Sequence, residues 1–289
     1  MFFNPLKALN LNIEYRILAI IMITEEVLKD IFKPKNTKWK TSITKVEPNK
    51  LITRGYKQED LIEKLSFPEM VYLLIKGKIP TYKESKMLES VLVSFCDHGV
   101  TPPSTQTARL IASAGSPIHA CLAGSILAFG KNHAGAIEKT MRLLQENLQN
   151  CKSSEIENIA QELVNRYLEN NCKIPGFGHR YHNCDPRASS LMKQVIKYDF
   201  IGKHYQLASS IENILLDLKG IQMNIDGANA AILSDLGFDW KIGSGMFMIG
   251  RLPGIIAHIN EEVSREKPFR KFFDLDEIYF DGQENNHIL

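Results

Sequence analysis

The sequence predicts a nearly all-α fold with one small β element near the N-terminus. Apolar residues recur three and four positions apart from residue 60 onward, whereas an alternating apolar and polar pattern is confined to residues 39–56. With 44% hydrophobic and 24% charged residues, the composition is typical of a globular protein and excludes wholesale disorder. A chain of 289 residues suits one large domain or two smaller ones.

The alternating segment predicts a short β-hairpin, with Pro48 and Asn49 as its turn residues. Two of the later helices have extensive polar faces, which favours a sub-domain over residues 134–170 that stands apart from the main core. The expected helices, in order, are 60–65, 67–76 ended by Gly77, 84–95, 105–114, 118–129, 136–149, 154–168, 187–197, 205–218, 226–236 and 244–263.

Charge and cysteine content argue against several functional classes. The 35 basic and 33 acidic residues leave a net charge of +2, so no polybasic surface indicates nucleic-acid binding. The apolar run 17–23 is far shorter than a membrane span, and no small-residue cleavage site follows it. The five cysteines are scattered and form no C-x-x-C pair, which favours reduced thiols and a cytoplasmic location.

Three segments between helices concentrate chemically active side chains. The first is the loop 129–138, Phe-Gly-Lys-Asn-His-Ala-Gly-Ala-Ile-Glu. Small residues flank His133 on both sides, as expected where a backbone must approach a ligand closely. Taken alone, this segment also fits a helix-joining loop with one solvated histidine.

The second segment is 173–187, Lys-Ile-Pro-Gly-Phe-Gly-His-Arg-Tyr-His-Asn-Cys-Asp-Pro-Arg. Pro175, Gly176 and Gly178 predict a turn whose amides point toward an anion, and His179 follows the turn directly. Asp185 precedes a proline and is expected to cap the next helix. A purely structural loop rarely needs two histidines, an aspartate and two arginines in so few residues.

The third segment is 223–229, Met-Asn-Ile-Asp-Gly-Ala-Asn. Asp226 is either a helix N-cap or a carboxylate in apolar surroundings, where desolvation strengthens it as a base. Two histidines of the second segment, His179 and His182, are three residues apart, but no carboxylate pair accompanies them and no metal site is predicted.

Together, two imidazoles, one carboxylate and a glycine-rich turn suit an enolisation site. A carbon acid beside a carbonyl needs a base for its proton and a donor for the developing enolate oxygen, and the electrophile needs an acid for its own oxygen. Asp226, His133 and His179 fit these three roles.

The same segments, in this order, resemble the citrate synthase family over roughly residues 50–270. The stretch 129–138 looks like that around the family's first catalytic histidine, Pro-Gly-Phe-Gly-His-Arg with Asp-Pro-Arg-Ala looks like its signature, and Asn-Ile-Asp looks like its catalytic aspartate stretch. The resemblance implies a citrate synthase-like helical fold and a homodimer. It also implies two domains: a large one of residues 1–133 and 227–289, and a small one of residues 134–226 that carries the coenzyme A site.

The resemblance also implies roles for individual residues. Asp226 would remove a methyl proton from acetyl-CoA, His133 would donate to the thioester oxygen, and His179 to the keto oxygen of oxaloacetate. His98, Arg187 and Arg251 match positions that hold the dicarboxylate, a task that suits the guanidinium fork. Coenzyme A, a co-substrate rather than a permanent cofactor, would lie against residues of the turn: Lys173, Ile174, Pro175, Gly176 and Gly178.

Several departures from the family pattern favour a lyase. The chain is short for a citrate synthase, the loop from His179 to Arg187 is one residue shorter than usual, and Lys267 stands where many synthases carry arginine. The sequence at residues 97–99 and 224–227 resembles the citryl-CoA lyase branch more closely; this branch cleaves citryl-CoA to acetyl-CoA and oxaloacetate.

Two alternatives remain at this point. A citrate or 2-methylcitrate synthase would use the same residues and also hydrolyse the thioester, and no motif decides between cleavage and condensation. A non-catalytic helical binding subunit is the other alternative. Loss of a catalytic position would indicate it, but all three positions are filled.

Overall fold

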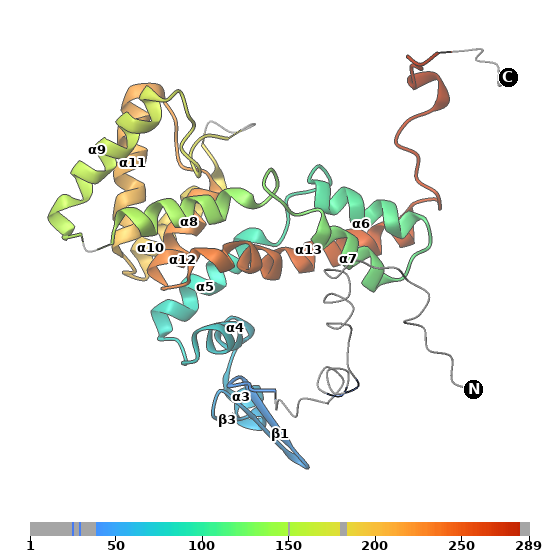
Figure 1. Cartoon of the computed structure of the whole chain (residues 1–289), viewed down its shortest axis with the longest axis horizontal. Coiled ribbons are helices and arrows are strands. Elements are labelled where there is room, and N and C mark those ends of the chain that lie inside the picture. Colours follow the sequence, from blue (N-terminus) through green and yellow to red (C-terminus); the bar gives the residue numbers. More distant parts are fainter. Residues whose placement is uncertain (1–24, 26–28, 30–38, 150, 180–183, 284–289) are drawn as a thin grey trace, which may run out of the picture.

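The computed structural model describes residues 25, 29, 39–149, 151–179 and 184–283 (Figure 1). The apolar run 17–23 and His182 lie outside these described residues. The predicted hairpin is confirmed as β1 (Thr44–Glu47) and β2 (Lys50–Thr53), which pair antiparallel with Glu47 opposite Lys50. Asn49 adopts a left-handed conformation (φ 56°) in the turn, and a short third strand, β3 (Tyr56–Lys57), completes the sheet.

The rest of the described chain is mostly helical, so the predicted fold class is confirmed. The α-helices are α3 (Gln58–Lys64), α4 (Phe67–Lys76), α5 (Tyr82–Phe95), α6 (Pro103–Ser113), α7 (Ile118–Leu127), α8 (Gly135–Asn147), α9 (Ile156–Glu169), α10 (Pro186–Lys197), α11 (Lys203–Lys219), α12 (Ile225–Asp235) and α13 (Gly243–Arg265).

Local capping explains where these helices begin and end. Ser66 and Glu69 form a reciprocal capping box at the start of α4, and Gly77 closes that helix with φ 75°. Thr81 caps α5, which therefore begins two residues before the predicted start at residue 84. Asp185 caps α10 by accepting a hydrogen bond from the Arg187 amide, as predicted.

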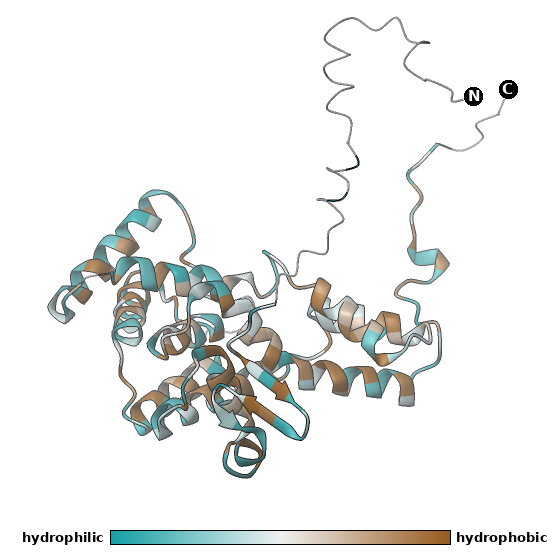
Figure 2. Cartoon of the chain, turned by 60° about the horizontal axis from the view of Figure 1, so that its bottom comes forward, coloured by the Kyte–Doolittle hydropathy of each residue, from teal (hydrophilic) through white to brown (hydrophobic). Residues whose placement is uncertain are grey.

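Most helices bury one apolar face in a shared core, and apolar and polar residues alternate around their ribbons in Figure 2. The main core joins α4, α5, α8–α12 and the first half of α13; Leu88 and Ile137, from the two predicted domains, are both part of it. A smaller cluster joins α6, α7 and the second half of α13. Helices α8 and α9 contribute to the main core and do not stand apart from it. The domain boundaries themselves stay a prediction.

Helix α13 connects the two clusters and runs from the main group of helices to α6 and α7 (Figure 1). Among the described residues, one helical stretch is long and apolar enough to cross a membrane by length and composition alone. It is Trp240–Arg265, which consists of α13 and the short 3-10 turn Trp240–Ile242 before it. It packs against α5, α6, α7 and α8, which is the environment of a core helix.

Candidate active site

A cavity of about 410 Å³ brings together side chains from five separate parts of the chain. It lies where the loop before α6, the loop before α8, the loop before α10, the start of α12 and the middle of α13 meet. All six residues predicted for catalysis and dicarboxylate binding line it: His98, His133, His179, Arg187, Asp226 and Arg251. The sequence segments that carry them are as far apart as residues 98 and 251, so the fold alone assembles this set.

Asp226 occupies the first turn of α12, and Asn224 is the residue that caps this helix. The interpretation of Asp226 as a helix cap was therefore wrong. The Asn224 Oδ1 atom accepts hydrogen bonds from the amides of Asp226 (3.0 Å) and Gly227 (3.1 Å). Burial raises the pKa of Asp226 to about 6, although Arg187 and Arg251 lower it in part. Such a carboxylate is a stronger base than an exposed aspartate.

His133 is held by a tight turn and by aromatic neighbours. Its backbone exchanges two hydrogen bonds of 2.9 Å with Gly130, and Ala134 follows in a left-handed conformation at the start of α8. Phe129 stacks on the ring, and the Ser104 hydroxyl lies 2.8 Å from Nε2. Burial lowers the pKa of His133, and the positive charge of Arg251 lowers it further. The imidazole is therefore neutral near pH 7, and when Ser104 donates to Nε2 the ring proton is on Nδ1.

His98 and Arg187 line the catalytic cavity and contact each other. Arg187 forms a bidentate pair with the buried Asp185, and its Nη1 donates to Nδ1 of His98 at 3.3 Å. Because this nitrogen accepts, a neutral His98 carries its proton on Nε2. Burial and then Arg187 lower the pKa of His98, which favours that neutral form. Nε and Nη2 of Arg187 therefore bind Asp185, and Nη1 binds His98.

Arg251 enters the cavity because α13 lies unusually close to the end of α5. Gly250 and Gly254 face the backbone of Leu92 and Cys96, where a Cβ atom on either glycine would clash. This approach lets Arg251 Nε donate to the Phe95 carbonyl at 2.6 Å, with the guanidinium over the Phe247 ring. Only 3% of Arg251 is exposed, so its charge acts in a weakly screened environment.

The loop carrying His179 is joined to the start of α12 by a short antiparallel pairing. Gly178 N donates to Gln222 O (2.8 Å), Asn224 N donates to Gly176 O (3.0 Å), and Asn224 Nδ2 donates to Gly178 O (2.7 Å). Asn224 therefore fixes both Asp226 and the residue before His179. The Gly178 amide is used within this pairing, so the expectation that it points toward an anion was wrong.

A second cavity, of about 540 Å³, adjoins the first at Gly178 and His179. Of the residues predicted to contact coenzyme A, Lys173, Ile174 and Gly178 line it, together with Lys219 at the end of α11. Pro175 and Gly176 line neither cavity. Gly176 is buried with φ 87°, against Gly227 and Thr140, so its position in the fold requires the absence of a side chain.

Four residues that shape these cavities were not predicted from the sequence: Ser104, Asn224, Lys219 and, as the partner of Arg187, Asp185. Asn224 had a signal, because asparagine is among the most favoured N-cap residues. Lys219, close to the Asp226 segment in sequence, also had one as a cation in the last turn of a helix. The contact between Ser104 and His133 spans 29 residues and had no local signal.

The arrangement combines a buried carboxylate of raised pKa with neutral imidazoles of lowered pKa and two guanidinium groups. Such a site can take a proton from carbon, donate to carbonyl oxygens and hold carboxylates. Among the residues that the structure describes, no group of three or more histidine, cysteine, aspartate or glutamate side chains is arranged to hold a metal ion.

Comparisons with known proteins agree with this chemistry. A family model described as the C-terminal domain of citrate synthase matches residues 35–90 and 82–271. The citrate synthase of Heyndrickxia coagulans is 31% identical over 219 residues, which are 72% of this chain and 56% of that protein. The chain thus spans just over half the length of the curated relatives it matches.

Two solved structures share the fold. The citryl-CoA lyase from Hydrogenobacter thermophilus matches with a TM-score of 0.79 and 41% identity, covering 87% of this chain and 97% of that one. The ATP citrate lyase from Methanothrix soehngenii, in complex with citrate and coenzyme A, matches with a TM-score of 0.74 and 20% identity. That match covers 98% of this chain and 47% of the other, and at this identity it bears on the fold alone.

Proposed function

The chain belongs to the citrate synthase family, and from this premise we propose that it makes or breaks the carbon–carbon bond between acetyl-CoA and oxaloacetate. The observation that carries the proposal is the single cavity that holds Asp226, His133 and His179 together with His98, Arg187 and Arg251. A carboxylate base of raised pKa, imidazoles and two arginines in one cavity suit the enolisation of a thioester beside a bound dicarboxylate.

In the condensing direction, Asp226 takes a proton from the methyl group of acetyl-CoA, and His133 donates to the thioester oxygen as the enol forms. The enol carbon then attacks the keto carbon of oxaloacetate, whose oxygen receives a proton from His179. In cleavage the steps reverse: the tertiary hydroxyl of citryl-CoA loses its proton, the carbon–carbon bond breaks, and Asp226 returns a proton to the methylene carbon.

We favour cleavage, as a citryl-CoA lyase. The support is the 41% identity to a citryl-CoA lyase over 87% of this chain, compared with 31% to the Heyndrickxia citrate synthase. A citrate synthase is the second candidate, since the model of that family matches most of the chain. The two activities differ in whether the thioester is hydrolysed, which requires a positioned water in the closed site.

Coenzyme A is proposed to lie in the second cavity as part of the substrate. Its lining offers apolar side chains for the pantetheine and adenine portions and two cations, Lys173 and Lys219, for phosphates. The cavity meets the catalytic one at Gly178 and His179, so a thioester placed there would extend toward Asp226. The Hydrogenobacter citryl-CoA lyase, 41% identical over 87% of this chain, acts by its name on a coenzyme A thioester and supports the same substrate class.

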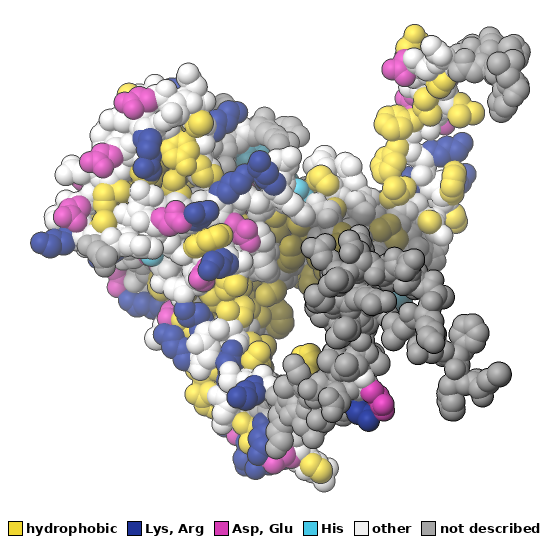
Figure 3. Space-filling view, in the orientation of Figure 1, with side chains coloured by type: hydrophobic (Ala, Val, Ile, Leu, Met, Phe, Trp, Pro, Cys, Tyr) yellow, Lys and Arg dark blue, Asp and Glu magenta, His cyan; other side chains and the backbone are white. Residues whose placement is uncertain are grey.

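Assembly as a homodimer is also proposed. Large apolar side chains are exposed on α7 and along the C-terminal segment 269–280, where Leu275 is 90% and Tyr279 89% exposed. This segment extends away from the body of the protein and carries a row of apolar side chains (Figure 3). Such a surface is costly in water and fits a second copy of the chain. Sedimentation should give twice the monomer mass; a monomer at micromolar concentration would contradict the dimer.

A cytoplasmic location is proposed from the cysteines alone.

Two parallel assays test the catalytic proposal. One supplies citryl-CoA and detects oxaloacetate with malate dehydrogenase; the other supplies acetyl-CoA with oxaloacetate and follows the free thiol. We expect fast oxaloacetate release in the first assay and slow thiol release in the second. The opposite pattern would identify a synthase, and no turnover in either assay would overturn the proposed function.

A further inference from the structure

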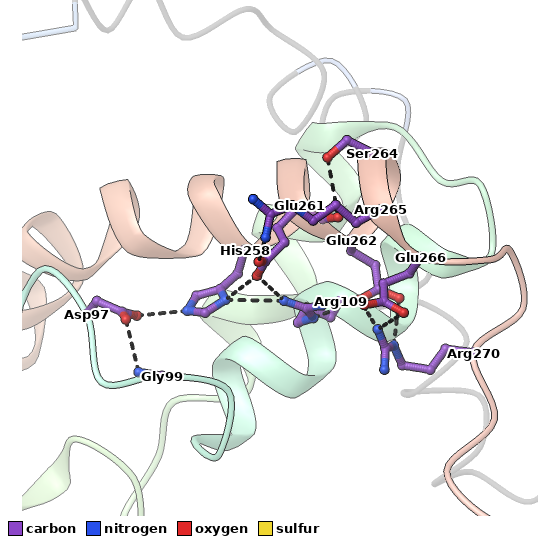
Figure 4. A network of polar contacts seen from close by, with 10 residues as sticks. All are labelled: Asp97, Gly99, Arg109, His258, Glu261, Glu262, Ser264, Arg265, Glu266 and Arg270. Carbon is purple, nitrogen blue, oxygen red and sulfur yellow. Dashed lines mark hydrogen bonds and ion pairs between the residues drawn. The ribbon is translucent and has the colours of Figure 1, made fainter.

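A network of polar contacts outside both cavities begins at residues 97–99 and follows α13 to the C-terminal segment (Figure 4). It starts beside His98, one of the residues lining the catalytic cavity. His258, in the last third of α13, lines neither the catalytic cavity nor the proposed coenzyme A cavity. It lies seven residues after Arg251, so the two side chains share one face of the helix.

The contacts at the start of this network hold the turn that carries His98. Asp97 accepts two hydrogen bonds, from His258 Nε2 at 3.0 Å and from the Gly99 amide at 3.0 Å. Gly99 has φ 72°, so the turn depends on its left-handed conformation. One turn earlier on α13, Gly254 lies against Cys96 and Asp97, and a side chain there would displace them. Helix α13 therefore both packs against the residues before His98 and binds them.

With His258 in its neutral form, the donors and acceptors along this network have one consistent order, although Glu261 Oε2 also lies 3.8 Å from Nδ1 of His258. Arg109 can only donate, and its Nη1 lies 3.4 Å from Nδ1 of His258. With Nδ1 accepting, the proton of a neutral His258 is on Nε2, which is the nitrogen that faces Asp97. Arg109 is held in turn by the fully buried Glu262 (Nε–Oε2, 2.7 Å) and by Glu261 (2.9 Å). His258 is thus fixed on both sides of its ring.

We propose that His258 is a positioning residue of the dicarboxylate site, acting through Asp97 on His98. The proposal rests on the proposed function, because it assumes that His98 contacts oxaloacetate. His258 touches no substrate in this account. It keeps the Asp97 carboxylate in place, Asp97 closes the turn at Gly99, and the turn presents His98 with Nδ1 toward Arg187.

The test uses the full chain and two replacements of similar size. His258→Phe fills the space but cannot donate to Asp97, whereas His258→Gln retains a donor near the position of Nε2. Oxaloacetate and acetyl-CoA are titrated separately by calorimetry. We expect His258→Phe to raise the dissociation constant of oxaloacetate about tenfold, the effect of losing one hydrogen bond to a charged group. His258→Gln should raise it no more than about threefold, and neither should change acetyl-CoA binding more than about twofold.

Asp97→Asn provides the second arm, because Asp97 is half-exposed and its replacement does not depend on refilling a core position. It should weaken oxaloacetate binding to a similar degree. The double variant Asp97→Asn/His258→Phe should be no worse than the weaker-binding single variant, since the two residues act through one contact. Arg265→Gln, at an exposed end of the network, is the control and should leave both ligands unaffected.

Equal losses for both ligands, additive effects in the double variant, or unchanged oxaloacetate binding would each overturn the positioning role. These outcomes presuppose that the wild-type protein binds oxaloacetate. If the wild type binds none up to millimolar concentration, both the proposed function and this inference fail. If it binds and the variants match it, only the inference fails.

Discussion

Two desolvated carboxylates in this protein have opposite surroundings. Glu262, in the network of Figure 4, has a fully buried side chain that accepts charged hydrogen bonds from both Arg109 and Arg270. Asp226 is also strongly desolvated, but among the described residues no group donates a hydrogen bond to its carboxylate, and Arg187 and Arg251 act on it only through space. Desolvation alone therefore does not decide the role of a carboxylate. A carboxylate paired with arginines stabilises the fold, whereas an unpaired carboxylate in a cavity can act as a base.

The largest expected effect is on the unpaired carboxylate. Asp226→Asn should lower the rate of methyl proton exchange in acetyl-CoA by about 10²–10⁴, because an amide of the same shape cannot accept the proton. Deuterium incorporation into the acetyl group measures this step alone. Near wild-type exchange in the folded variant would remove Asp226 from the role of base.

The same variant should be more stable than the wild type at high pH. The pKa of Asp226 is raised from 3.8 to about 6 in the folded state, so its ionised form costs stability as pH rises through this window. Replacing it should recover about 3 kcal/mol at pH 8 and almost nothing below pH 4. Denaturant unfolding at the two pH values measures the difference, and a loss of stability at pH 8 would contradict it.

The paired carboxylate should respond in the opposite direction. Glu262→Gln leaves the buried side of Arg109 without its counter-charge and should cost about 3 kcal/mol of unfolding free energy. Glu261→Gln is the matched control, since Glu261 also contacts Arg109 but is 37% exposed, and should cost no more than about 1 kcal/mol. Equal costs for the two variants would show that burial does not distinguish these contacts.

A smaller effect is expected for the two arginines of the cavity. Arg187→Lys and Arg251→Lys keep the charge but lose the guanidinium geometry, which in Arg187 also holds the pairing with Asp185. Each should raise the KM for oxaloacetate about tenfold and leave that for acetyl-CoA nearly unchanged. Steady-state kinetics with either substrate varied provides the comparison. Equal effects on both substrates would assign the arginines to folding or to coenzyme A phosphates.

The smallest effect is expected at the exposed lysine of the second cavity. Lys219→Ala should weaken acetyl-CoA binding about threefold, and this loss should shrink as salt is added. Lys197→Ala, at the end of the preceding helix α10 and outside that cavity, serves as the control. An effect of equal size in both variants would argue against a specific phosphate contact.

Short-range patterns were enough to predict the helices, the hairpin and the Asp185 cap, because periodicity and capping act within a few residues. The site was predicted only as separate segments, whose order along the chain resembled a known family. Local sequence patterns do not determine how far apart these segments lie in the folded protein. Gly176 illustrates this: its glycine was expected to face a ligand, but it is required by contact with Gly227, 51 positions later in the chain. The Ser104–His133 contact likewise exists only in the folded protein.

The pH dependence of methyl proton exchange by the wild-type protein tests the central claim most directly. The claim is that burial makes Asp226 a base of raised pKa while His133 stays neutral. Deuterium incorporation into acetyl-CoA should therefore rise with pH as Asp226 loses its proton, with a midpoint near 6, and then reach a plateau. A midpoint near the ordinary aspartate value of 3.8, or a rate independent of pH across this range, would contradict the account.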